Sequence, residues 1–380
     1  MSSLSLSILP AIEAVAASQW NALVGEDQPY LRHEFLLALE TSGCVSRETG
    51  WEPCHYVLWQ GGELVGALPH YRKYHSFGEY VFDWSWAEAL EQAGGNYYPK
   101  GLSAVPFTPV PGGRTLLADH LDPVAARRVL AEGWRKACRR DELSGWHLLF
   151  SDDDDVTAWR EACPELVARY GVQFQWRDRD YGDFEGFLAS MTAKRRKTIR
   201  RERRRVAEQG LSLSRLQGEA ITAEAMAHFY RCYAITYHER GRPPYLTHDF
   251  FERLRREFAG SLLLVQVRLA GRPVAAALYL QGAHSLYGRY WGSEIYADCL
   301  HFEACYYQGI EHCLENGLTL FDPGTQGEHK LTRGFAPRQL RSLHYLAHPG
   351  LHAGVAEFCR EEGEHIRAYR DAAVEALPFK

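Results

Sequence analysis

The chain has 380 residues, of which 46% are hydrophobic and 24% are charged, and its formal net charge is −5. A chain of this length is too long to fold around one ordinary hydrophobic core, so we expect two domains. The composition is that of a soluble globular protein rather than a disordered or fibrous one. No apolar run reaches the ~18 residues that a membrane helix needs.

The N-terminus has no basic start, and Pro10 and Glu13 interrupt its apolar residues, so we predict no signal peptide. Nine cysteines occur without a Cys-x-x-Cys pair. This pattern argues against a disulfide framework and suits the reducing cytoplasm, where we expect the protein to reside.

The first half of the chain predicts a mixture of helices and strands. Turn residues, alternating apolar residues and helix-start signals predict where each element lies. Because 95–117 contains four prolines, we expect part of that segment to lie at a sheet edge or to be irregular. The predicted elements are helices at 15–24 and 33–43, two strands within 54–74 joined at Gly61-Gly62, strand-like 95–117, a helix at 123–143, a buried strand at 145–150, and a helix opened by the acidic residues 151–155.

The second half repeats this order of elements, which hints at a duplicated α/β unit. We predict helices at 183–208, 222–240, 247–258 and 299–317, two strands within 261–282 joined at Ala270-Gly271-Arg272, further strands at 284–292, 318–322 and 341–348, and a charged terminal helix.

Segment 194–205, KRRKTIRRERRR, carries nine bases and one acid. Its charge of +8 leaves about −13 for the rest of the chain by the same counting. On a helix, Arg196, Arg200 and Arg204 recur every four residues and share one face. The nine basic side chains repel one another, so we expect their charge to be compensated by distant carboxylates or by an anionic ligand, such as a diphosphate or RNA. A solvated surface helix is the alternative.

The predicted helix 299–317 carries several groups with chemical potential. Glu303, near two tyrosines, is a candidate general base or an ordinary ion-pair partner. One helical face carries His301, Cys305, Gln308 and His312. A His-x-x-x-Cys pair can ligate zinc, but two ligands do not make a site, so we expect His301 to be a buried, hydrogen-bonded histidine and predict no metal.

Segment 321–337, FDPGTQGEHKLTRGFAP, directly follows a predicted buried strand. Ligands of open α/β sheets lie beyond the carboxyl ends of strands, so the position favours a binding loop. Lys330 and Arg333 could hold phosphate or stabilise an oxyanion, while Asp322, Glu328 and His329 could move protons. The glycines that would let the backbone approach a ligand are Gly324, Gly327 and Gly334, and the apolar anchors are Phe321, Leu331 and Phe335. A mobile exposed loop is the alternative.

Together these segments resemble the FemAB-like (peptidoglycan biosynthesis/recognition) family of predicted N-acyltransferases. The resemblance spans nearly the whole chain and rests on residues 29–43, 96–114, 190–213, 289–313 and 321–337. It implies an α/β fold with mixed sheets, in which two GNAT-like lobes face each other across a cleft and the C-terminal helix packs back on the first lobe. The expected boundaries are 1–165, 166–345 and 346–380.

The resemblance also implies a reaction, the transfer of an acyl or aminoacyl group to an amine. In the Fem peptidyltransferases the donor is aminoacyl-tRNA and the acceptor a UDP-linked peptidoglycan precursor of the bacterial cell wall. No GNAT coenzyme A loop is evident around 289–303, and acyl-CoA and aminoacyl-tRNA both stay open as donors. Where those enzymes carry a lysine in an aromatic-Lys-x-Gly-Phe stretch, this chain has Thr332, flanked by Lys330 and Arg333.

We therefore predict an N-acyltransferase. The predicted catalytic residues are Lys330, Arg333, Glu303, His329 and Asp322, and the predicted substrate- or anion-binding residues are Arg196, Arg200, Arg204, Gly324, Gly327, Tyr290, Trp291, His301, Lys100 and Arg114. The acceptor amine would lose its proton to Glu303, His329 or water. A non-catalytic GNAT-like module that binds a phosphate-bearing cell-wall precursor or RNA is the alternative.

Overall fold

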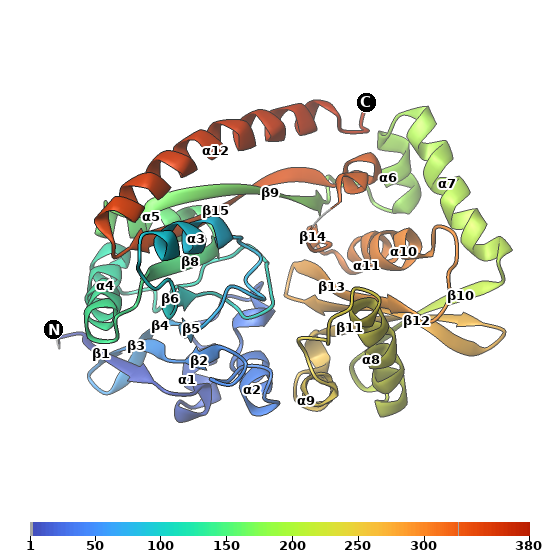
Figure 1. Ribbon diagram of the computed structural model, residues 1–380. Coiled ribbons are helices and arrows are strands. Elements are labelled where there is room, and N and C mark those ends of the chain that lie inside the picture. The colour runs from blue at the N-terminus through green and yellow to red at the C-terminus, as the bar shows by residue number, and fades with distance from the viewer. Residues whose placement is uncertain (1–2, 326) are drawn as a thin grey trace. The chain divides into compact units, whose positions relative to one another are not determined.

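A computed structural model describes residues 3–325 and 327–380, so Gln326 of the 321–337 loop lies outside the described residues. The chain forms two compact units (Figure 1). Unit 1 comprises Met1–Val172 and Gln339–Ala368, and unit 2 comprises Gln173–Arg338 and Tyr369–Lys380. The chain leaves unit 1 within strand β9 (Val167–Arg177) and returns within strand β15 (Ala336–Leu346).

Unit 1 contains two groups of strands, ordered β1-β3-β4-β7 and β15-β8-β6-β5-β2. The predicted hairpin at Gly61-Gly62 is confirmed by the antiparallel pairing of β3 with β4. From Ser5 to Ala162, the helices and strands of unit 1 are β1 (Ser5–Leu9), α1 (Ala17–Asn21), α2 (His33–Thr41), β2 (Trp51–Pro53), β3 (His55–Gln60), β4 (Glu63–Leu68), β5 (Tyr71–Lys73), α3 (Trp84–Gln92), β6 (Lys100–Ser103), β7 (Leu116–Leu117), α4 (Pro123–Arg140), β8 (Gly145–Ser151) and α5 (Asp153–Ala162).

Large aromatic side chains fill the core of unit 1. Trp134 of α4 stacks on Trp146 of β8 with ring centroids 5.1 Å apart, and Trp159 of α5 packs against Trp146. The acidic start of α5 is confirmed, because Asp152 caps the helix by accepting a hydrogen bond from the Asp155 amide at 2.9 Å.

The C-terminal helix α12 (Pro349–Glu375) returns to the first lobe, as predicted. Val355 and Cys359 are buried in one apolar cluster with Trp86 and Leu90 of α3. Residues after Ala368 belong to unit 2, where the Thr192 amide donates to the Pro378 carbonyl at 2.9 Å.

Unit 2 has the strand order β10-β11-β12-β13-β14-β9. Helices α8 and α9 lie on one side of β11–β13, and α10 and α11 lie on the other (Figure 1). Its elements are α6 (Phe184–Ser190), α7 (Ala193–Glu208), β10 (Leu211–Gln217), α8 (Ala223–His238), α9 (His248–Glu257), β11 (Leu262–Leu269), β12 (Arg272–Gln281), β13 (Ser285–Ser293), α10 (Leu300–Phe302), the π-helical segment η5 (Glu303–Tyr307), α11 (Gln308–Asn316), β14 (Leu320–Asp322) and the 3-10 helix η6 (Glu328–Arg333).

Two predicted helices are interrupted. The helix expected over 183–208 is two helices, because Met191 and Thr192 are extended and Met191 forms a β-bridge with Phe379. The helix expected over 299–317 ends at left-handed Gly317 as predicted, but its middle is π-helical. This segment adds a residue to the turn, so the side chains expected on one helical face do not stay in register.

None of the helices within residues 3–325 and 327–380 combines the length and apolarity required to cross a membrane. All nine cysteines are free, as predicted.

Candidate functional site

The 321–337 loop begins where β14 ends and is held against the core of unit 2. Its predicted apolar anchors Phe321, Leu331 and Phe335 are buried. Asp322 is also buried, and its carboxylate accepts hydrogen bonds from Gln175 Nε2 at 2.8 Å and from the Gly324 amide at 2.9 Å. Gly324 has φ +91°, and a Cβ there would lie 2.9 Å from the Gly288 carbonyl oxygen, so this turn requires glycine.

Lys330, on η6, points into the loop. Its side chain is almost completely buried, and Nζ donates to the carbonyls of Gly324 at 2.5 Å and Thr325 at 3.2 Å. Burial lowers the pKa of Lys330 to about 8, with the nearby Asp322 carboxylate opposing that shift and Arg289 adding to it. Lys330 therefore fixes the start of the loop and carries a positive charge at neutral pH.

Arg333, at the other end of η6, fastens the loop to the basic helix α7. Its Nη2 lies 2.7 Å from Glu202 Oε1, its Nε donates to the Tyr307 hydroxyl at 3.0 Å, and Tyr307 in turn donates to Glu202. The guanidinium carbon lies 3.5 Å from the centroid of the Phe302 ring. Glu202, the only acid within 194–205, thus pairs with a residue of the loop rather than with its own helix.

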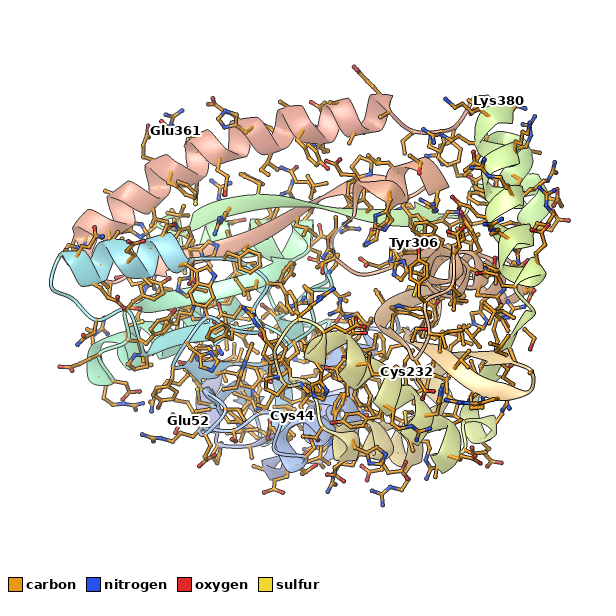
Figure 2. The ribbon with its side chains drawn as sticks, turned by 45° about the vertical axis from the view of Figure 1, so that its right-hand side comes forward. Cys44, Glu52, Cys232, Tyr306, Glu361 and Lys380 are labelled. Atoms are coloured by element: carbon orange, nitrogen blue, oxygen red, sulfur yellow. The ribbon has the colours of Figure 1, made fainter. Side chains whose placement is uncertain are left out.

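His329 is an exposed member of the predicted proton-transfer groups. His329 Nε2 lies 2.8 Å from the Tyr306 hydroxyl, and Figure 2 shows Tyr306 on the segment between α10 and α11. The ring of His301 lies 6.3 Å from that of His329 and 5.7 Å from that of Trp291. The fold of unit 2 thus brings His329 of the loop beside His301 and Tyr306, which lie more than 20 residues earlier in the chain.

Both histidines of this group are neutral at pH 7. Burial, together with the neighbouring His329, Lys330 and Arg333, lowers the pKa of His301 to about 4. Burial, followed by the charges of Arg333 and Lys330, also lowers the pKa of His329 below its ordinary value. A neutral imidazole has a lone pair that can accept a proton.

Glu303 is occupied by an ion pair. Its carboxylate accepts from Arg203 Nη2 at 3.0 Å and Nε at 3.1 Å, and from Gln308 Nε2 at 2.9 Å. Of the two roles considered for this carboxylate, the geometry corresponds to the ion-pair partner. The other members of the predicted helical face also separate, since His312 Nε2 lies 2.8 Å from Gln281 Oε1 and Cys305 is a free, partly buried thiol.

The arginines predicted to share an anion-binding face of α7 are largely engaged by the protein. Arg196 donates to the Met191 carbonyl at 2.6 Å, Arg200 pairs with Glu185, and Arg204 Nε lies 3.5 Å from Glu208 Oε1.

A different stripe of α7 is open. Lys194, Lys197 and Arg201 occur at i, i+3 and i+7, are exposed, and have no carboxylate within 4.0 Å among the described residues. We call these three residues the basic stripe. The sequence of 194–205 shows that α7 is basic, but which of its basic side chains are paired depends on carboxylates contributed by distant parts of the chain.

Three further predicted binding residues, Tyr290, Lys100 and Arg114, are buried. Tyr290 packs against Phe251 with ring centroids 5.2 Å apart. In unit 1, Arg114 donates to the carbonyls of Leu149 at 3.1 Å and Gly112 at 3.0 Å. Lys100, also in unit 1, is completely buried and donates to Ser76 at 2.9 Å, to Glu79 at 2.8 Å and to Asp83. Burial by itself would lower the pKa of Lys100, but the two carboxylates raise it above its ordinary value.

The fold is shared with solved structures of low sequence identity. The C-terminal domain of a lysylphosphatidylglycerol synthetase from Agrobacterium fabrum matches with a TM-score of 0.56 and 10% identity, over 90% of this chain and 95% of that one. FemX matches with a TM-score of 0.50 and 12% identity, over 83% and 93%. L-PGS from Bacillus licheniformis matches with a TM-score of 0.50 and 10% identity, over 85% and 95%. No curated protein sequence matches the chain.

A family model described as FemAB-like, peptidoglycan biosynthesis/recognition, matches residues 11–380. The chain therefore belongs to the FemAB-like family, and the predicted mixed α/β fold is confirmed.

Proposed function

We propose that this member of the FemAB-like family is an N-acyltransferase, which transfers an acyl or aminoacyl group from a phosphate-bearing donor to an amine. The family match over residues 11–380 carries the proposal, since it covers both units and includes the 321–337 loop. A peptidoglycan precursor is the proposed acceptor, and acyl-CoA and aminoacyl-tRNA are the two donor classes to be compared.

In the proposed reaction, His329 is the general base. The acceptor nitrogen attacks the donor carbonyl carbon, the C–N bond forms, and the C–O or C–S bond to the donor breaks. The proton lost by the amine passes to the imidazole of His329 and then to the leaving oxygen or sulfur. Three observations support His329: it is exposed, its pKa is lowered so that it is neutral at pH 7, and Tyr306 fixes its ring through Nε2 at 2.8 Å.

Lys330 and Arg333 act in this proposal through their charge and through the loop that they hold. Both guanidinium and ammonium groups make their hydrogen bonds inside the protein. Their charges nevertheless reach the neighbouring imidazoles, since they lower the pKa of both His301 and His329. The same positive field favours the oxyanion that develops on the donor carbonyl.

The basic stripe on α7 is the proposed contact for the phosphates of the donor. Lys194, Lys197 and Arg201 are exposed on one face, and no carboxylate in the described chain neutralises them. Exposed unpaired cations of this kind attract phosphate, and a tRNA or a coenzyme A would each supply it.

The proposal is tested by incubating the protein with acyl-CoA or aminoacyl-tRNA and with a UDP-linked peptidoglycan precursor, and by identifying the product by mass spectrometry. His329→Asn should reduce the transfer rate by about 10²–10⁴-fold, the usual contribution of a general base. The matched control is His238→Asn, since His238 is also exposed and lies at the end of α8 in the same unit. Equal rates in both variants would exclude His329 as the base.

Binding without transfer is the alternative, and the basic stripe is the observation that favours it. A non-catalytic module would bind the precursor or RNA saturably, would yield no acylated product with either donor, and would be insensitive to His329→Asn. Product formation by the unaltered protein would eliminate this alternative.

A further inference from the structure

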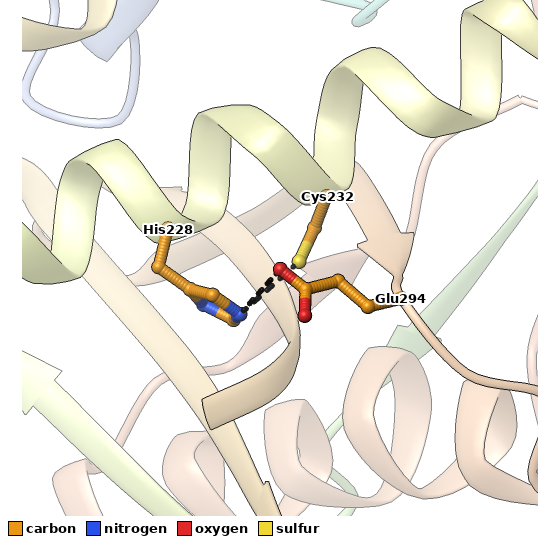
Figure 3. A group of neighbouring side chains, drawn as sticks. All are labelled: His228, Cys232 and Glu294. Atoms are coloured by element: carbon orange, nitrogen blue, oxygen red, sulfur yellow. Dashed lines mark hydrogen bonds and ion pairs between the residues drawn. The ribbon is translucent and has the colours of Figure 1, made fainter. Parts of the chain in front are cut away.

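Three side chains with metal-binding atoms converge in unit 2, away from the loop described above. They are His228 and Cys232 of α8 and Glu294, which directly follows β13, and their ligand atoms lie within 4.8 Å of one another. Figure 3 shows the imidazole, the thiol and the carboxylate pointing toward a common point. We infer that His228 Nε2, Cys232 Sγ and Glu294 Oε1 form a site for a zinc-type divalent cation.

The distances from His228 Nε2 to the other two ligand atoms match those around a tetrahedral zinc ion. Bonds of about 2.0–2.1 Å to nitrogen and oxygen and about 2.3 Å to sulfur, at tetrahedral angles, place nitrogen and sulfur about 3.6 Å apart and nitrogen and oxygen about 3.4 Å apart. The observed distances are 3.4 Å from His228 Nε2 to Cys232 Sγ and 3.7 Å from His228 Nε2 to Glu294 Oε1. These two distances differ from the tetrahedral values by a few tenths of an ångström, and Cys232 Sγ and Glu294 Oε1 lie within 4.8 Å of each other.

The backbone around these residues leaves them little freedom to move apart. A Cβ on Gly292 would lie 1.8 Å from the Cys232 carbonyl oxygen, so α8 touches β13 through a glycine at the cysteine itself. One turn further along α8, the Thr236 hydroxyl donates to the Trp291 carbonyl at 3.0 Å. The Glu294 amide donates to the Val274 carbonyl of β12 at 2.8 Å. The ligands therefore stand on two helix positions one turn apart and on a strand end that is fixed by its neighbour.

The surroundings orient the carboxylate for binding through one oxygen. Arg272 Nη2 donates to Glu294 Oε2 at 2.9 Å, and Oε1 lies 3.7 Å from His228 Nε2 and 3.8 Å from Nε of the exposed Arg231. Such outer contacts to a ligating carboxylate are usual in metal sites. His228 and Cys232 are completely buried, and His228 Nδ1 has no hydrogen-bond partner among the described residues, so the imidazole has no competing role in the core.

Zinc binding here would replace the thiol proton, which is released to solvent as the Zn–S bond forms, and the apparent affinity should therefore rise with pH. The Glu294 side chain is 19% exposed, which gives a water molecule access to the fourth position. The ion would join α8 to the end of β13, at a residue two positions beyond Gly292. This inference does not depend on the proposed transfer reaction.

The test uses the whole chain, freed of metal with a chelator and then equilibrated with Zn²⁺ or Co²⁺. Bound metal is quantified by inductively coupled plasma mass spectrometry after gel filtration. The cobalt form should show a thiolate-to-metal charge-transfer band and the intense visible absorption of a tetrahedral ion. Site variants are C232S, H228Q and E294Q, and the matched control is C299S, since Cys299 is a less buried thiol of the same unit.

The unaltered protein and C299S should bind a stoichiometric amount of zinc and gain thermal stability from it, whereas the three site variants should lose both effects. E294Q changes only a partly exposed residue, so it keeps the test decisive where C232S or H228Q fails to fold. The inference is overturned if the unaltered protein binds no stoichiometric metal, if E294Q binds as much zinc as the unaltered protein does, or if the charge-transfer band disappears in C299S.

Discussion

Replacing Glu202 with alanine leaves the guanidinium of Arg333 buried without its carboxylate. The side chains of the two residues are only 10% and 8% exposed, and Glu202 also accepts the hydroxyl proton of Tyr307. Removal of one partner of a buried ion pair costs about 3–5 kcal/mol, because the remaining charge is uncompensated. Arg333 keeps its hydrogen bond to the His329 carbonyl at 2.8 Å and its contact with the Phe302 ring, so we expect the lower end, about 3 kcal/mol.

The control is Glu208→Ala on the same helix. Glu208 lies 3.5 Å from Arg204, but the two side chains are 58% and 67% exposed, and an exposed pair of this kind contributes less than about 1 kcal/mol. For a unit of this size, about 1 kcal/mol corresponds to a Tm change of about 2–4 °C, so Glu202→Ala should melt about 6–12 °C lower than the unaltered protein.

Thermal melts of the two variants, followed by circular dichroism and calorimetry, measure this difference. If the units unfold separately, only the transition of unit 2 should shift. Because Arg333 and Tyr307 hold η6, Glu202→Ala should also reduce the transfer rate below the melting temperature, which Glu208→Ala should not. A Tm for Glu202→Ala equal to that of Glu208→Ala would refute the role given to the buried pair.

Three further outcomes are expected. The His329 pKa is lowered by burial, Arg333 and Lys330, so kcat/KM should be constant near pH 7, where Lys330 keeps its charge, and should fall on the acid side only below the ordinary histidine value of about 6.5, as the imidazole becomes protonated; an acid-side midpoint above that value contradicts a neutral base. Replacing Lys194, Lys197 and Arg201 together with alanine should raise KM for the donor and lower the slope of log K against log salt by about 2–3, whereas Arg204→Ala, which removes a paired base, should change the slope little. Gly292→Ala should destabilise unit 2 by at least about 1–3 kcal/mol in urea unfolding, because its Cβ would overlap the Cys232 carbonyl, while Gly260→Ala, at a position with open space, should be close to neutral.

Local signals were sufficient for most secondary structure. Two glycines between alternating apolar residues predicted the β3–β4 hairpin, and the apolar run ending in Asp322 predicted β14. The two interrupted helices could not be predicted locally. Thr192 leaves the helical conformation where its amide meets the Pro378 carbonyl, a contact with a segment almost at the end of the chain.

The site was less accessible to sequence reasoning than the fold. The residue types of the 321–337 loop and its position after a buried strand predicted a loop that is anchored to the core, and its apolar anchors are indeed buried. Which charges are free, however, depends on partners that lie far away in sequence. Glu202 pairs with Arg333 and Arg203 pairs with Glu303, more than 90 residues along the chain in each case, and no periodicity within α7 contains that information.

These distant pairs change the chemistry that can be assigned to the loop. Lys330 and Arg333 would be natural phosphate or oxyanion contacts if they were exposed, but their donors serve the backbone of the loop, Tyr307 and Glu202. A buried cation that already has hydrogen-bond partners acts on its surroundings through its field, and that field adds to the effect of burial in lowering the pKa of His301 and His329. The two cations and the exposed imidazole are therefore parts of one arrangement: the cations hold η6 in place and lower the histidine pKa, and His329 is left as the group that can accept a proton.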